Sequence, residues 1–254
     1  EGNLANIFPM MFVSIACGAI SGFHATQSPM MARCMKNETM GRRCFYGAMV
    51  TEGIVALAWA AAATYFFGEN GLYNAATGKG YDGGTVVSLI SYNWLGVFGG
   101  ILALLGVAFA PISTGDTALR SARLIISDFL HIDQKTVSKR LWISLPIFVV
   151  TAAILIWSMN DANGFGKLWR YFGWSNQALS VFTLWAITVY LKVSKKNYWV
   201  TLIPAMFMTV VTTSFILMLK PGGFGLPYEI SVGIGIAIAI FFASLFFLRK
   251  GKRG

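Results

Sequence analysis

Seven apolar segments constrain this chain more than any other feature of its sequence. A helix that crosses a bilayer needs about 20 mostly apolar residues, because the hydrocarbon core is about 30 Å thick. The segments are Leu4–Ile20, Ala48–Phe67, Trp94–Ile112, Trp142–Met159, Trp174–Leu191, Trp199–Leu219 and Ile230–Leu248. No run alternates with period 2, so strands are not expected. We therefore expect an all-α protein, a polytopic transmembrane helix bundle of about seven spans that forms a single transmembrane domain over residues 1–254.

The basic residues predict an orientation in the membrane. The net charge is +10, but the charges lie in short clusters between apolar segments, which argues for membrane topology and against a nucleic-acid partner. With the N-terminus outside, sixteen of the 20 Lys and Arg residues fall on the inside. The four on the outside are Lys79, Lys167, Arg170 and Lys220. The positive-inside rule therefore places the C-terminus in the cytoplasm.

Several other classes of protein are disfavoured by the motifs that the chain lacks. It has no HExxH, G-x-S-x-G or phosphate-loop motif, and its two histidines lie far apart, so we expect no enzymatic activity. The cysteines Cys17, Cys34 and Cys44 have no metal-binding spacing, and we expect no metal and no cofactor. The chain starts at Glu1 without a signal peptide, which favours the downstream part of a longer protein.

The end of the first apolar segment is unusually polar and contains helix-weakening residues. Its candidate substrate-binding residues are Gly18, Ser21, Gly22, His24, Thr26 and Gln27. Non-helical backbone at membrane depth survives only where it is buried in protein or lines a cavity, and such discontinuous helices form transporter binding sites. The alternative is that the helix ends at Ile20 and an interfacial loop follows. His24 is either a proton carrier or a hydrogen-bonded structural residue.

A second group of polar residues follows Pro111, where the third segment should end. Pro111 and Gly115 should loosen the backbone there, and Ser113, Thr114 and Asp116 supply oxygen atoms suited to Na⁺ or a proton. A carboxylate in the membrane usually faces a partner or a water-filled path. The alternative is an interfacial ion pair of Asp116 with a basic residue one turn later, Arg120. Leu119, Ala122, Ile126 and Phe129 share one face, which predicts that the helix continues inward.

Three further polar residues lie within apolar segments. Glu52 is either a buried functional carboxylate or a structural partner of Arg42 or Arg43. Asn176 and Gln177 follow an aromatic run, Trp169–Trp174. Their amides are candidates for substrate binding, or they hydrogen-bond to a neighbouring helix.

Four stretches resemble the signature sequences of the carbon starvation protein A (CstA) family. They are Gly18–Arg33, Gly41–Met49 followed by Glu52-Gly53, Ala110–Ala118 followed by Arg120 and Arg123, and Trp169–Leu179. The resemblance covers about two-thirds of the chain in family order. It implies a secondary transporter of the bacterial inner membrane, linked to uptake of peptides and pyruvate under carbon limitation. Family members are much longer, so the resemblance implies a C-terminal portion whose partners are the remaining helices and membrane lipid.

The resemblance also implies a LeuT-type inverted-repeat fold, whose second repeat opens with a broken helix. By that analogy Ser113 and Thr114 match the hydroxyl ligands of the ion in Na⁺-coupled relatives. Together with the carboxylates Asp116 and Glu52 they are our candidate ion-coupling residues, and the coupling ion is H⁺ or Na⁺. The substrate would be a small carboxylate such as pyruvate, or a short peptide, bound near Gly18–Gln27 and transported by alternating access. The alternative function is that of a non-transporting membrane sensor or scaffold component.

Overall fold

The computed structural model is a helical protein that divides into two compact units. One unit comprises Glu1–Arg33 and Leu145–Gly254, and the other comprises Cys34–Ser144. The structure describes residues 6–68, 71, 73–74, 79–81, 83–161, 164–220 and 222–248. The basic cluster expected inside at the C-terminus, Arg249 to Arg253, lies outside these residues.

In the described part of the chain, five helices are long and apolar enough to cross a membrane. They cover Glu38–Phe67, Gly83–Leu130, Val137–Asn160, Trp199–Met218 and Tyr228–Leu248. Many of their large apolar side chains are exposed, as expected for surfaces that face lipid rather than water. The expected all-α membrane class is confirmed at this level, and the count of seven spans stays a prediction.

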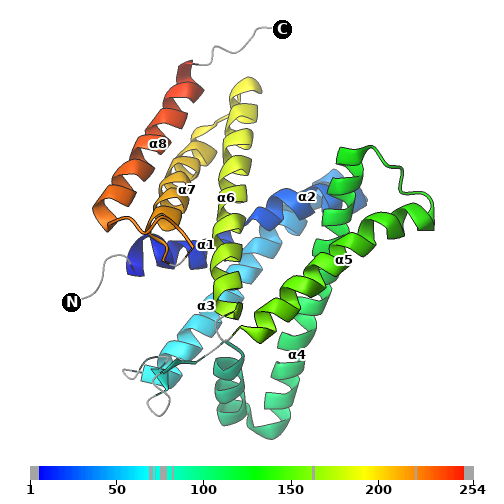
Figure 1. The fold of residues 1–254 in the computed structure, drawn as a ribbon, viewed down its shortest axis with the longest axis vertical. Helices are drawn as coiled ribbons and strands as arrows, with labels where there is room; N and C mark the ends of the chain where they lie inside the picture. Colours follow the sequence, from blue (N-terminus) through cyan, green and yellow to red (C-terminus); the bar gives the residue numbers. More distant parts are fainter. Residues whose placement is uncertain are drawn as a thin grey trace. The chain divides into compact units, whose positions relative to one another are not determined.

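Three long helices form the larger part of the first unit. They are α6 (Gly164–Val193), α7 (Trp199–Met218) and α8 (Tyr228–Leu248). α7 packs against both of the others and lies between them (Figure 1). At 1.5 Å per residue, the 30 residues of α6 extend about 45 Å. α6 is not among the five apolar spans, since its amides and basic residues make it more polar.

Small and hydroxyl-bearing residues bring α7 and α8 into close contact. Ser214 is fully buried and its Oγ atom donates to the backbone oxygen of Ser231, 3.3 Å away. A Cβ atom on Gly235 would lie 2.8 Å from Ser214 Oγ and 3.0 Å from the oxygen of Val210. Small residues and interhelical hydrogen bonds of this kind stabilise helix pairs in lipid, where the hydrophobic effect contributes little.

The N-terminal segment packs against this three-helix group through two apolar clusters. It comprises η1 (Asn6–Met11), α1 (Phe12–Ala19) and α2 (Gly22–Cys34). In one cluster Val13 contacts buried residues of α7 and the residue after it. In the other, Ala16 contacts residues of α6 and α7. The buried members are Val13, Val211, Phe215 and Leu219 in the first, and Ala16, Val181 and Met208 in the second.

The second unit contains η2 (Glu38–Met40), η3 (Arg42–Gly47), α3 (Ala48–Phe67), α4 (Gly83–Leu130) and the start of α5 (Val137–Asn160). The connection between α3 and α4 includes a two-residue antiparallel pair, β1 (Tyr73–Asn74) and β2 (Lys79–Gly80). α3 and α4 meet through aromatic rings, with Tyr65 and Phe66 on one side and Trp94 on the other.

The break in α4 is not where the sequence predicted it. The expected loosening at Pro111 and Gly115 is wrong, because the helix is continuous from 97 to 130. Its continuation beyond the third apolar segment is confirmed, whereas the inward direction stays a prediction. The non-helical residue is Gly96, with φ 65° and ψ −169°. Glycine reaches positive φ without the steric penalty of a Cβ atom, whereas a proline removes only one helical N–H group and membrane helices tolerate it.

Candidate functional site

The first apolar segment forms a discontinuous helix. α1 ends at Ala19, and Ile20 has an extended backbone with φ −140° and ψ 104°. α2 then begins at Gly22 and runs for 13 residues, with Pro29 inside it. The expected break is confirmed, and it is limited to Ile20 and Ser21. The alternative, an interfacial loop after Ile20, is not what the chain forms.

Ser21 and His24 form a capping box at the start of α2. The Oγ atom of Ser21 accepts a hydrogen bond from the backbone N–H of Phe23 at 3.1 Å. The Nδ1 atom of His24 lies 2.9 Å from the backbone nitrogen of Ser21, which donates to it in the tautomer protonated on Nε2. Glu or Gln usually reaches back in this way. Two orphan N–H groups at the break are therefore satisfied locally.

The same imidazole nitrogen has a second neighbour. His24 Nδ1 lies 3.0 Å from the backbone oxygen of Ser21. A neutral ring with a bare Nδ1 accepts from the Ser21 N–H, whereas a doubly protonated ring has only donors and must turn to the Ser21 oxygen. Which of these two backbone atoms is bonded therefore depends on whether His24 Nδ1 carries a hydrogen.

The break is docked on α6 at Asn176. The hydroxyl of Ser21 donates to Asn176 Oδ1 over 3.0 Å, and both side chains are buried. A Cβ atom on Gly22 would lie 2.8 Å from the backbone oxygen of Asn176 and 3.0 Å from the Cβ atom of Leu179. Only glycine allows this approach, so two segments 155 positions apart meet at the backbone break.

Gln177 ties the preceding helix to the same part of α6. Its side chain is fully buried, and Nε2 donates over 3.4 Å to the backbone oxygen of Val13 in α1. Ser180, one turn later, donates to the Gln177 backbone oxygen at 2.7 Å. Asn176 and Gln177 thus hold the two halves of the discontinuous helix, which agrees with the helix-packing alternative and leaves substrate binding a prediction.

The remaining candidates of the first segment lie in the two helical halves. Gly18 is within α1. The hydroxyl of Thr26 donates to the backbone oxygen of Phe23, as a helix hydroxyl commonly does. The Nε2 atom of Gln27 is buried and has no hydrogen-bond partner in the described part of the chain. An unpaired buried amide donor is costly, so Gln27 is the candidate here that is best placed to gain from a bound acceptor.

A cavity of about 270 Å³ with two cationic side chains lies against α1 in the same unit. α1 contributes Val13, whose backbone oxygen binds Gln177, and Ser14. Arg170 of α6 and Lys220 after α7 also line this cavity. Neither cation forms an ion pair or hydrogen bond with a described residue, and no acidic side chain lines the cavity.

The sequence analysis did not select Arg170 or Lys220, although the sequence contains a signal for them. Both belong to the four basic residues on the side that the positive-inside rule leaves poor in positive charge. A third member of this group, Lys167, forms an ion pair with Asp161 and is thereby neutralised. Arg170 and Lys220, which have no ion-pair partner among the described residues, thus line one cavity.

The predicted ion-coupling residues lie in the second unit. Asp116 pairs with Arg120 at 2.7 Å, and both side chains are more than half exposed. The hydroxyl of Ser113 donates to the backbone oxygen of Ala110 within α4, where Thr114 also lies. Glu52 is exposed on α3, and no ion pair joins it to Arg42 or Arg43, which are also described. No hydrogen bond or ion pair among the described residues joins Glu52 to the three α4 residues, and the ion site stays a prediction.

Comparison with known proteins assigns a family. The family model for carbon starvation protein CstA matches residues 2–91 and 83–215. The peptide transporter CstA of Campylobacter jejuni is 28% identical over 267 residues, which cover 81% of this chain and 38% of the transporter. The pyruvate/proton symporter BtsT of Escherichia coli is 46% identical over 70 residues, 27% of this chain and 10% of the symporter. An "uncharacterized protein" of Haemophilus influenzae is 43% identical over 121 residues, 48% of this chain and 83% of that protein.

The chain spans about two-fifths of the length of the peptide transporters it matches. No solved structure matches it.

Proposed function

The chain belongs to the carbon starvation protein CstA family, and on this premise we propose that it contributes the substrate site of a secondary active transporter. The substrate is a small carboxylate such as pyruvate, or a short peptide. Symport with a cation drives its uptake across the bacterial inner membrane. The relatives' names, peptide transporter and pyruvate/proton symporter, support this substrate class. In this proposal both units belong to one transmembrane domain of seven spans with a LeuT-type inverted repeat.

The observation that carries the proposal is the discontinuous helix α1–α2 and its attachment to α6. A break inside an apolar segment is costly in lipid and persists where it serves a binding site. The break lies beside buried amides, Asn176 and Gln177, and α2 presents the unpaired donor of Gln27. A carboxylate accepts several hydrogen bonds, so it suits a site built from such donors.

The cationic cavity supports an anionic substrate. Arg170 and Lys220 have no acidic partner among the described residues, and such a cavity attracts carboxylates by long-range electrostatics. Both pyruvate and a peptide C-terminus carry the required negative charge. Arg170 and Lys220 therefore raise the local concentration of the anionic substrate next to α1, and the discontinuous helix binds its carboxylate.

The coupling cation is H⁺ or Na⁺, and the proposal favours the proton. The Nδ1 atom of His24 lies within hydrogen-bonding distance of both the N–H and the oxygen of Ser21, so a proton on this imidazole would act directly on the backbone of the break. Ser113, Thr114, Asp116 and Glu52 remain the candidates for the cation site itself. Coupling requires that cation and substrate stabilise the same conformations, so that each raises the affinity for the other.

The test is uptake of labelled pyruvate into proteoliposomes that contain the full-length gene product. H⁺ and Na⁺ gradients are imposed separately, with unlabelled di- and tripeptides as competitors. Gradient-driven uptake of pyruvate that peptides do not inhibit would identify a monocarboxylate symporter and its ion. Absence of uptake with labelled pyruvate and with labelled peptides under both gradients would contradict the proposal and favour a sensor or scaffold.

A matched pair of glutamines tests the site. Gln27→Met removes an amide that has no partner, so we expect unchanged stability and a higher KM for the carboxylate. Gln177→Met removes an amide that binds Val13, and we expect a loss of about 1–3 kcal/mol in stability because the amide is buried and bonded. An unchanged KM in Gln27→Met would remove this residue from the site.

A further inference from the structure

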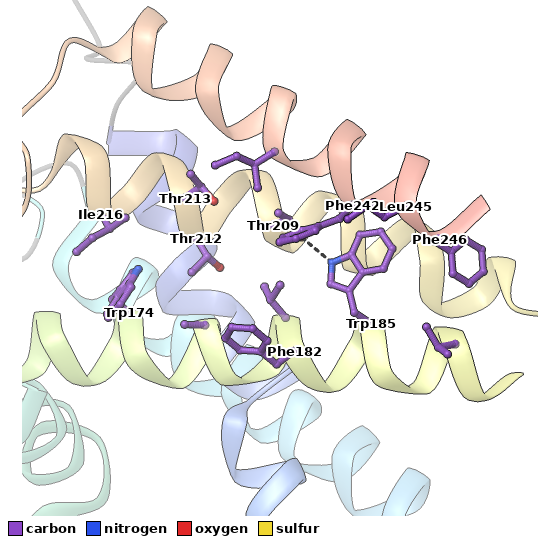
Figure 2. Close-up of a pocket in the computed structure, with 14 residues that line it drawn as sticks. Trp174, Phe182, Trp185, Thr209, Thr212, Thr213, Ile216, Phe242, Leu245 and Phe246 are labelled. Carbon is purple, nitrogen blue, oxygen red and sulfur yellow. Dashed lines mark hydrogen bonds between the residues drawn. The ribbon is translucent and has the colours of Figure 1, made fainter. Parts of the chain in front are cut away.

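An apolar cavity of the first unit lies between α6, α7 and α8. Its volume is about 430 Å³, a size typical of ligand sites. Its walls are aliphatic and aromatic, including Val181, Phe182, Val189, Ile238 and Leu245. Figure 2 shows the lining side chains entering this space from all three helices. The cavity is distinct from the cationic cavity beside α1.

Two residues at one end of this cavity each have a buried polar atom without a partner among the described residues. Trp174 extends from α6 and Thr212 from α7 toward the same space (Figure 2). The Nε1 atom of Trp174 and the Oγ1 atom of Thr212 are buried, and neither has a hydrogen-bond partner among the described residues. Thr212 is only 6% exposed, so water cannot readily satisfy its hydroxyl.

The other Trp–Thr pair that lines the cavity is hydrogen-bonded. Trp185 Nε1 donates to Thr209 Oγ1 over 3.1 Å, and that hydroxyl donates to the backbone oxygen of Ala205. The same residue types on the same two helices therefore bond to each other in one place and remain unpaired in the other. The unpaired end has the chemistry to bind one oxygen acceptor at the end of an apolar channel.

The dimensions of the cavity favour a hydrocarbon chain as its occupant. Its lining extends along α6 from Trp174 to Val189, about 22 Å at 1.5 Å per residue. One leaflet of the hydrocarbon core is about 15 Å thick, so the cavity is long enough for a single acyl chain.

We infer that this cavity binds the acyl chain of a membrane phospholipid, with the ester carbonyl at Trp174 and Thr212. Trp174 begins the apolar segment of α6, and tryptophan prefers the interfacial depth at which lipid carbonyls lie. The carbonyl oxygen accepts from the indole N–H and the hydroxyl once these side chains turn toward the cavity, and the chain covers the apolar walls. The lipid is a structural ligand that joins the three helices.

Photo-crosslinking tests this inference in the full-length gene product. The protein is reconstituted with phosphatidylethanolamine that carries a diazirine in its acyl chain, illuminated, and analysed by peptide mapping. We expect labelled residues to concentrate on the cavity faces of α6, α7 and α8. Labelling spread evenly over the exposed apolar surface would overturn the inference. So would labelling elsewhere with none in the cavity, because a further helix would then fill it.

Three variants sharpen the test. Ala178→Phe places a ring in the cavity and should reduce labelling of the cavity residues to background. Ala237→Phe adds the same ring on an exposed part of α8 and should leave labelling of the cavity residues unchanged. Thr212→Val removes one hydrogen bond at nearly constant volume and should weaken labelling about two- to tenfold. Labelling that persists in Ala178→Phe would overturn the assignment of the cavity. Thermal unfolding of each variant verifies that it remains folded.

Discussion

Replacing Gly22 by alanine should separate the discontinuous helix from α6. The added Cβ atom would lie 2.8 Å from the backbone oxygen of Asn176, 2.9 Å from its Oδ1 atom and 3.0 Å from Leu179 Cβ. The backbone oxygen cannot move away by a change of rotamer, so α2 or α6 must shift. Overpacking of this kind costs about 1–3 kcal/mol. That energy corresponds to about a 5- to 150-fold change in the equilibrium between docked and undocked α2.

The assay combines the thermal unfolding midpoint of the purified protein with the initial rate of uptake. For a chain of this size the cost predicts a midpoint lowered by roughly 2–12 °C. It also predicts lower uptake, because the hydrogen bond between Ser21 and Asn176 depends on the same close approach. Gly233→Ala is the matched control, since a Cβ atom there meets nothing within 4 Å. A Gly22→Ala variant with the midpoint and uptake of the unmodified protein would refute the reasoning.

Three further predictions concern charge and coupling. His24→Gln should keep the bond to the Ser21 N–H but removes the imidazole as a proton carrier, so uptake should persist with a flattened pH profile; an unchanged profile would exclude a proton role. Asp116→Asn should abolish gradient-driven uptake while changing stability by less than about 1 kcal/mol, since its ion pair is exposed; undiminished uptake would exclude Asp116 from coupling. Arg170→Gln and Lys220→Gln should each raise the KM for an anionic substrate several-fold, and high salt should remove this effect. Lys167→Gln is the control, because Lys167 is already paired with Asp161, and an equal rise in KM in all three variants would contradict the role of Arg170 and Lys220 in attracting the substrate.

The discontinuous helix was predictable from sequence, but its partner was not. Glycines and polar residues in an apolar segment indicate a break by local chemistry, and the structure confirms it at Ile20 and Ser21. The sequence also marked Asn176 as a polar residue in an apolar segment. That Ser21 bonds to Asn176 depends on packing between segments 155 positions apart, which no local pattern contains.

The error in α4 has a related cause. Proline and glycine in Pro111–Gly115 indicated a weak point, yet the helix continues through them and breaks at Gly96. The helix propensity of a residue describes which backbone conformations it favours when isolated. The packing of the surrounding helix decides which of these conformations it adopts. The cationic cavity was missed for another reason. Arg170 and Lys220 are 50 positions apart and meet only when α1, α6 and the end of α7 pack together.

The sequence by itself determined the membrane class, the apolar segments, the family and the residues able to break the first helix. Each of these follows from composition, hydropathy or short motifs, which act over a few residues of chain. Tertiary structure alone decided which polar atoms are satisfied by a partner within the described chain and which are not. Asn176 and Gln177 bond to the broken helix, while Gln27, Trp174 and Thr212 each have one buried polar atom without a partner among the described residues. The physical reason is that hydrogen bonding between distant segments depends on distance and burial, and both are set by how the helices pack.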